Sequence, residues 1–208
     1  MIIVIGGTSC VGKTNLAAML MKRYAIPYFS VDHLMMGLYR SDSKCGFTPE
    51  STIDKISRNI WPIIYEMIKT NIENDNSFIY EGVQILPEKI KEMDTSYLTS
   101  VVPVFICLSE KYILKNYQII KGKRDVVEKR TDSVESIDKM IQLNNGMIEK
   151  CEKNNIEPCI INGNYLEEVE EIMKRIDLTI ASTLTTRPDT QSASLINVAD
   201  CAPGSGCR

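Results

Sequence analysis

The sequence predicts an α/β fold in which a five-stranded parallel sheet lies between two layers of helices. Two observations predict it. Short apolar segments alternate along the chain with longer segments whose apolar residues recur at helical spacing. Most of the short segments are continuous apolar runs, as is typical of strands that are buried on both faces. A β–α alternation of this kind gives parallel strands with crossover helices on the two faces of the sheet.

Five short segments are predicted strands: 2–5, 28–31, 77–80, 101–108 and 159–161. Gly6 and Gly7 follow the first of them, and Glu81 and Gly82 follow the third. Pro103 must lie near the beginning of its strand, because proline has no N–H for the hydrogen-bond ladder.

The predicted helices cover residues 13–24, 50–74, 109–120, a long segment from about 134, and 166–176. Ser109 has the residue type and position of an N-cap. Pro62 falls inside the second helix, so a kink or a break is expected near Trp61. In the last helix, Val169, Ile172 and Met173 are expected to face inward.

Length and composition limit the possible classes. With 208 residues, one domain with an appendage is expected, and residues 181–208 are predicted to be a disordered tail because they are rich in small and polar residues. A formal charge of -3 gives no reason to expect nucleic-acid or membrane binding. No apolar run reaches the ~18–20 residues of a membrane span. Seven scattered cysteines and one histidine favour reduced thiols in a cytosolic protein over a zinc site, and nothing indicates an oligomeric state.

A phosphate-binding motif follows the first strand and opens the first helix. The motif G-x-x-x-x-G-K-[ST] is matched without a gap by Gly7, Thr8, Ser9, Cys10, Val11, Gly12, Lys13 and Thr14. In this context the backbone N–H groups and the helix N-terminus can bind phosphate. Lys13 can reach the β- and γ-phosphates, and the Thr14 hydroxyl can ligate magnesium. A P-loop NTPase fold that binds a nucleoside triphosphate with Mg²⁺ is therefore predicted.

The remaining sequence favours a small kinase within this class. The GTPase signatures D-x-x-G and N-K-x-D are absent. Residues 111–130 contain seven Lys or Arg and two acidic residues, a local charge of +5 in an acidic protein. We interpret this segment as a lid whose cations, first of all Arg124 and Arg130, neutralise the transferring phosphoryl group. A solvated helix face is the simpler interpretation of any one of these residues.

Four further residues are candidates for the acceptor site. Asp32 follows the second strand, at the sheet edge where open α/β folds bind ligands, and could be the catalytic base; it could also cap a helix beginning at His33. Arg40 could bind an anionic group of the substrate, or could be merely exposed. Glu81 could be a base or orient magnesium, and Gly82 could allow close approach of substrate.

With these motifs assembled, the chain resembles the kinase module of 2-phosphoglycerate kinase and, more widely, small kinases of the shikimate, gluconate and zeta-toxin type. The resemblance covers about residues 1–178 and rests on the phosphate-binding motif, on Asp32 with Arg40 downstream, and on the stretch from Tyr80 to Pro87, whose pattern E-G-V-x-x-x-P is the more family-specific element. Gln84 replaces the histidine usual in that family. The resemblance implies ATP, Mg²⁺ and phosphoryl transfer to the hydroxyl of a small molecule.

Two alternatives stay open at the level of sequence. One is a nucleoside monophosphate kinase of the adenylate type. The other is a non-kinase switch that binds ATP and acts through its tail. The acceptor itself is not indicated, because residues 37–67 carry no motif.

Overall fold

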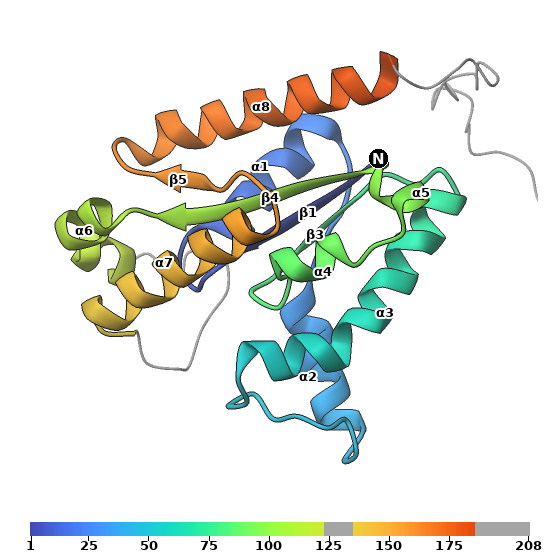
Figure 1. Ribbon diagram of the computed structural model, residues 1–208, viewed down its shortest axis with the longest axis horizontal. Helices are drawn as coiled ribbons and strands as arrows, with labels where there is room; N and C mark the ends of the chain where they lie inside the picture. The colour runs from blue at the N-terminus through green and yellow to red at the C-terminus, as the bar shows by residue number, and fades with distance from the viewer. Residues whose placement is uncertain (123–134, 186–208) are drawn as a thin grey trace, which may run out of the picture.

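The computed structural model describes residues 1–122 and 135–185, and its centre is a five-stranded sheet in the order β2-β3-β1-β4-β5 (Figure 1). Every neighbouring pair of strands is parallel, which confirms the predicted fold class. The strands are β1 (Ile2–Gly7), β2 (Tyr28–Ser30), β3 (Phe78–Glu81), β4 (Val101–Leu108) and β5 (Cys159–Ile161). Pro103 is the third residue of β4, opposite Val4 and before the three-residue stretch of β4 that pairs with β5.

Helices connect the strands and cover the sheet. They are α1 (Lys13–Tyr24), α2 (Val31–Ser41), α3 (Ile53–Glu73), α4 (Pro87–Lys91), α5 (Thr95–Leu98), α6 (Glu110–Gly122), α7 (Ile137–Lys153) and α8 (Tyr165–Thr185). The sequence pattern predicted α1 with its observed bounds. It did not indicate α4 and α5, because helices of one turn carry too few residues for a periodic pattern.

The two faces of the sheet form two separate cores. Ile2 and Val4 of β1 face the core that contains buried residues of α2, α3, α4 and α7. Ile3 and Ile5 face the opposite core, built mainly from α1, α6 and α8. Alternate residues of a strand point to opposite faces, so a continuous apolar run can supply both cores. Figure 1 shows α8 along one face of the sheet and α7 and α4 along the other.

Of the two outcomes expected near Pro62, a kink or a break, the break does not occur: α3 is continuous from Ile53 to Glu73 with Pro62 inside it. Proline removes one backbone hydrogen bond from a helix interior. On either side of it, Ile60, Trp61 and Ile64 are buried in the core. Burial of such large apolar side chains contributes about 1.5–3 kcal/mol each, which is enough to offset the lost bond.

The last helix is longer than predicted. Val169, Ile172 and Met173 are buried as expected, but α8 runs to Thr185 and so includes the first residues of the segment predicted to be a tail. Residues 186–208 lie outside the described residues. Within the described part of the chain, no helix combines the length and the apolar character needed to cross a bilayer.

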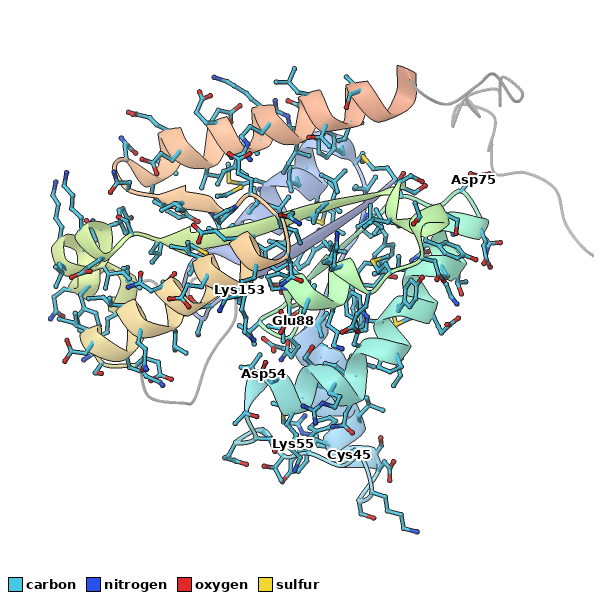
Figure 2. All side chains as sticks on the ribbon, viewed as in Figure 1. Cys45, Asp54, Lys55, Asp75, Glu88 and Lys153 are labelled. Carbon is cyan, nitrogen blue, oxygen red and sulfur yellow. The ribbon has the colours of Figure 1, made fainter. Side chains whose placement is uncertain are left out.

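A three-way ionic contact joins the helices on the Ile2 face. Lys150 of α7 donates hydrogen bonds to Asp54 at the start of α3, over 2.7 Å, and to Glu88 of α4, over 3.0 Å. Figure 2 shows Asp54 and Glu88 close together below α7. The bond from Lys150 lowers the pKa of the Asp54 carboxyl. The contact therefore fixes the beginning of α3 against α4 and α7.

Candidate active site

The phosphate-binding loop lies between β1 and α1, with a backbone that only a few residue types adopt easily. Gly7 has φ 135°, Cys10 φ 62° and Gly12 φ 96°. Positive φ at these positions turns the backbone so that successive N–H groups can face one point, as in an anion-binding nest. A Cβ on Gly7 would overlap the carbonyl oxygen of Ile106 in β4. Both glycines of the motif are therefore required by the geometry of the loop.

Lys13 and Thr14 are the first two residues of α1, and both are buried. The Lys13 ammonium lies over the loop and donates a 2.7 Å hydrogen bond to the Thr8 carbonyl oxygen. The first turn of α1 has no acidic residue, so nothing there opposes the positive end of the helix dipole. The predicted motif residues are thus brought together in one positively polarised loop.

The loop fits a nucleotide phosphate and its magnesium ion. Its glycines form a cradle that side chains would fill, and the buried Thr8 hydroxyl has no hydrogen-bond partner among the described residues. Such a buried hydroxyl is costly unless it is satisfied. The residues that would hold the triphosphate are the N–H groups of residues 8–13 with the Lys13 ammonium, and Thr14 would supply a hydroxyl to Mg²⁺.

Asp32 and Glu81 lie at the same edge of the sheet as the loop. Ser30 at the end of β2 is in register with Glu81 of β3, and Glu81 is in register with Ile5 of β1. The N–H of Gly82 donates to the Ile5 carbonyl oxygen over 3.1 Å, directly before the glycines of the loop. Glu81 is only 2% exposed. Sheet topology therefore places a buried carboxylate beside the phosphate-binding loop.

Asp32 is not the N-cap considered from the sequence. Helix α2 begins at Val31, so Asp32 is its second residue and Ser30 is the flanking residue. The Asp32 side chain is half-buried, and its Oδ1 accepts a 2.6 Å hydrogen bond from Nε2 of Gln84. A carboxylate in the first turn of a helix is also stabilised by the helix dipole. The structure therefore places the Asp32 carboxylate at the sheet edge, in contact with Gln84.

The absence of a side chain at Gly82 is required by packing within the protein. A Cβ at this position would lie 2.8 Å from the Cβ of Val31 and 2.7 Å from the Gln84 side-chain oxygen. The space beside Gly82 is thus filled by protein, and the glycine lets the β3–α4 loop pack on the start of α2.

Some of the basic candidate residues lie within the described part of the chain, and the others lie outside it. Arg40 is exposed in the last turn of α2, eight residues from Asp32 along the chain. Lys111, Lys115 and Lys121 are exposed on α6. Arg124 and Arg130 lie outside the described residues.

Tyr165 is a site residue that the sequence reasoning missed. It is the first residue of α8, and its hydroxyl occupies the position that a Cβ on Gly12 would take. Asn15 of α1 donates to the same hydroxyl over 3.5 Å. Burial raises the pKa of Tyr165, so the phenol stays protonated at neutral pH. Only the order of strands and helices could have indicated this contact: in a parallel sheet, a residue that follows β5 lies at the same sheet edge as the loop.

Cys10 offers a direct measurement of nucleotide binding, because it is half-buried within the loop. We expect Mg·ATP to slow alkylation of Cys10, with peptide mass spectrometry as the readout. Cys45, half-buried in the α2–α3 connection and seen at the lower end of the molecule in Figure 2, is the control whose alkylation should not change. Cys107 should stay unmodified, since burial raises its pKa to about 12. Equal alkylation of Cys10 with and without nucleotide would contradict binding at this loop.

Comparison with known proteins supports the fold. Neither a protein-family model nor a curated protein matches the sequence. A putative kinase from Chloroflexus aurantiacus has 14% identity and a TM-score of 0.50, over 86% of this chain and 97% of its own. Shikimate kinase from Bacteroides thetaiotaomicron has 12% identity and a TM-score of 0.50, over 85% and 98%. A gluconokinase from Sinorhizobium meliloti has 14% identity and a TM-score of 0.49, over 89% and 97%. The two structures with a TM-score of 0.50 show that the chain shares its α/β fold with small kinases.

Proposed function

We propose that the protein is an ATP-dependent kinase that transfers the γ-phosphoryl group to a hydroxyl of a small molecule. One observation carries the proposal: a complete phosphate-binding loop and two carboxylates, Asp32 and Glu81, meet at one edge of a parallel sheet. A nucleotide-binding module that only switches between states needs the loop but not a base for an acceptor hydroxyl. The fold shared with small kinases supports the same assignment.

The proposed reaction assigns one task to each group. Backbone N–H groups of the loop and the Lys13 ammonium hold the β- and γ-phosphates and stabilise the charge that develops on their oxygens. Asp32 accepts the proton of the acceptor hydroxyl as its oxygen bonds to the γ-phosphorus and the bond to the β–γ bridging oxygen breaks. Thr14 would hold a magnesium ion through its hydroxyl and Glu81 would orient it, and the ion would supply positive charge to the phosphates. The leaving group is ADP.

A screen of acceptors tests the proposal directly. ADP release should be measured with Mg·ATP over a panel of hydroxy acids, sugars, nucleosides, nucleoside monophosphates and antibiotics, 2-phosphoglycerate among them. We expect release well above basal hydrolysis with at least one hydroxyl compound, together with a phosphorylated product by mass spectrometry. Phosphorylation of AMP in preference to all others would assign the chain to the adenylate type. No acceptor-dependent release, with nucleotide binding intact, would refute the proposal.

The role of Asp32 gives a separate prediction. We expect Asp32→Asn to lower kcat by ~10²–10⁴-fold, the usual contribution of general base catalysis, without weakening nucleotide binding. Asp42→Asn is the matched control, because Asp42 is exposed at the other end of α2. Steady-state kinetics of both variants decide the matter. A kcat for Asp32→Asn within a few-fold of the wild-type value would show that Asp32 is not the base.

A further inference from the structure

We propose that Gln84 is a positioning residue that fixes the carboxylate of Asp32 for catalysis through a neutral hydrogen bond. The inference rests on the proposed function, because it concerns the base of that reaction. Gln84 lies in the β3–α4 loop, and Asp32 lies in the first turn of α2. Two segments far apart in the sequence thus meet at a bond between side chains, from Gln84 Nε2 to Asp32 Oδ1, of 2.6 Å.

The Gln84 amide is held in one place from several sides. The residue is only 1% exposed. Its Oε1 lies against Gly82, where a Cβ would approach within 2.7 Å. Its Nε2 also contacts the Met35 sulfur over 3.5 Å. An amide packed this way has no free rotation, so the direction of the N–H that it offers to Asp32 is fixed by the fold.

The structure also indicates that this arrangement is not there for stability alone. The side-chain oxygen of Gln84 is buried without a hydrogen-bond partner among the described residues. Burying an unsatisfied amide oxygen is unfavourable, whereas an apolar side chain of the same length would avoid that cost. The Gln84 amide thus costs free energy to bury and makes one directed hydrogen bond, to the candidate base Asp32. A positioning role explains why an amide is present at this position.

The chemistry of the bond suits a base. The amide donor contacts one carboxylate oxygen, Oδ1, and restricts the rotation of Asp32 so that the second oxygen keeps a constant direction. An amide has no proton that dissociates near neutral pH and carries no charge. Gln84 therefore orients the carboxylate without placing an opposite charge beside it.

The test compares the kinetics of four variants with those of the wild type, using the acceptor that the wild type phosphorylates best. Gln84→Met keeps the length of the side chain and removes the donor. Ile85→Val, in the same loop, disturbs buried packing without touching the bond. The third variant is Asp32→Asn, and the fourth is Asp32→Asn combined with Gln84→Met. Thermal unfolding of each protein shows that it is folded.

We expect Gln84→Met to lower kcat by ~10–100-fold, the loss caused by misorientation of a catalytic group, with an unchanged KM for ATP. Ile85→Val should retain wild-type kcat. In the Asp32→Asn background the same Gln84 change should have almost no effect on kcat, because the group it positions is gone.

Three results would overturn the inference while the proposed function stands. The first is a wild-type kcat in Gln84→Met. The second is a Gln84→Met variant in which only the KM for the acceptor rises. The third is a loss of kcat on adding Gln84→Met to Asp32→Asn that is as large as the loss in the wild-type background. Absence of transfer by the wild type to any acceptor would overturn the proposed function and the inference together.

Discussion

Replacing Lys13 by methionine is expected to lower kcat/KM for phosphoryl transfer by ~10²–10³-fold or more, the typical loss when one group that stabilises transition-state charge is removed. The ammonium lies over the phosphate-binding loop, 2.7 Å from the Thr8 carbonyl oxygen. From this place it can reach the phosphoryl group that carries the developing charge. Methionine fills the volume of the lysine stem but has no charge and no donor. Steady-state ADP release and product mass spectrometry measure the effect.

Stability separates loss of function from loss of fold in this variant. Lys13 is 5% exposed, so most of its stem is packed. Methionine preserves that packing. It also removes a charge whose burial costs free energy, so the substitution is not expected to destabilise the fold. Thermal unfolding should therefore occur close to the wild-type temperature. Transfer by a folded Lys13→Met at the wild-type rate would refute the assignment of the loop as the ATP site.

The sequence was most informative where a local pattern determines the geometry. The loop from Gly7 to Thr14 combines glycines at positions of positive φ with a lysine at the start of the helix. Both glycines and the lysine can be recognised in the sequence from their spacing alone. The strands could be predicted equally well, because continuous apolar runs such as 2–5 supply both cores. These features depend on neighbours in the sequence, and local physics is sufficient to predict them.

The contacts that were missed depend on segments distant in the sequence. Tyr165 meets Gly12 across about 150 residues, and Gln84 meets Asp32 across 52. Nothing in the residues around Tyr165 indicates that its hydroxyl will lie against the loop. The burial of Gln84 likewise depends on how the β3–α4 loop packs on α2. Pro62 shows the limit of a local rule: the proline itself does not decide between a kink and a break, and α3 continues through it with buried residues on both sides.

Gly12→Ala is expected to have the second large effect, on nucleotide binding. Gly12 has φ 96°, where an L-residue is strained by about 1–2 kcal/mol. Its new Cβ would also overlap the Tyr165 hydroxyl. If the loop relaxes to relieve both, its N–H groups no longer face one point. We therefore expect the Kd for Mg·ATP to rise by about 10-fold or more, since 1.4 kcal/mol corresponds to tenfold. Isothermal titration calorimetry measures it.

Two further variants separate the causes of this effect. Gly146→Ala is the matched control, because Gly146 lies inside α7 with open space around its Cα; it should bind nucleotide normally and gain about 0.5–1 kcal/mol of stability. Adding Tyr165→Ala to Gly12→Ala removes the overlap but keeps the strain of positive φ, so binding should recover in part. Full recovery would assign the whole effect to Tyr165. No recovery would assign the effect to backbone strain. Unchanged affinity for Mg·ATP in Gly12→Ala itself would contradict the role of the loop, because the loop geometry has no room for a side chain at position 12.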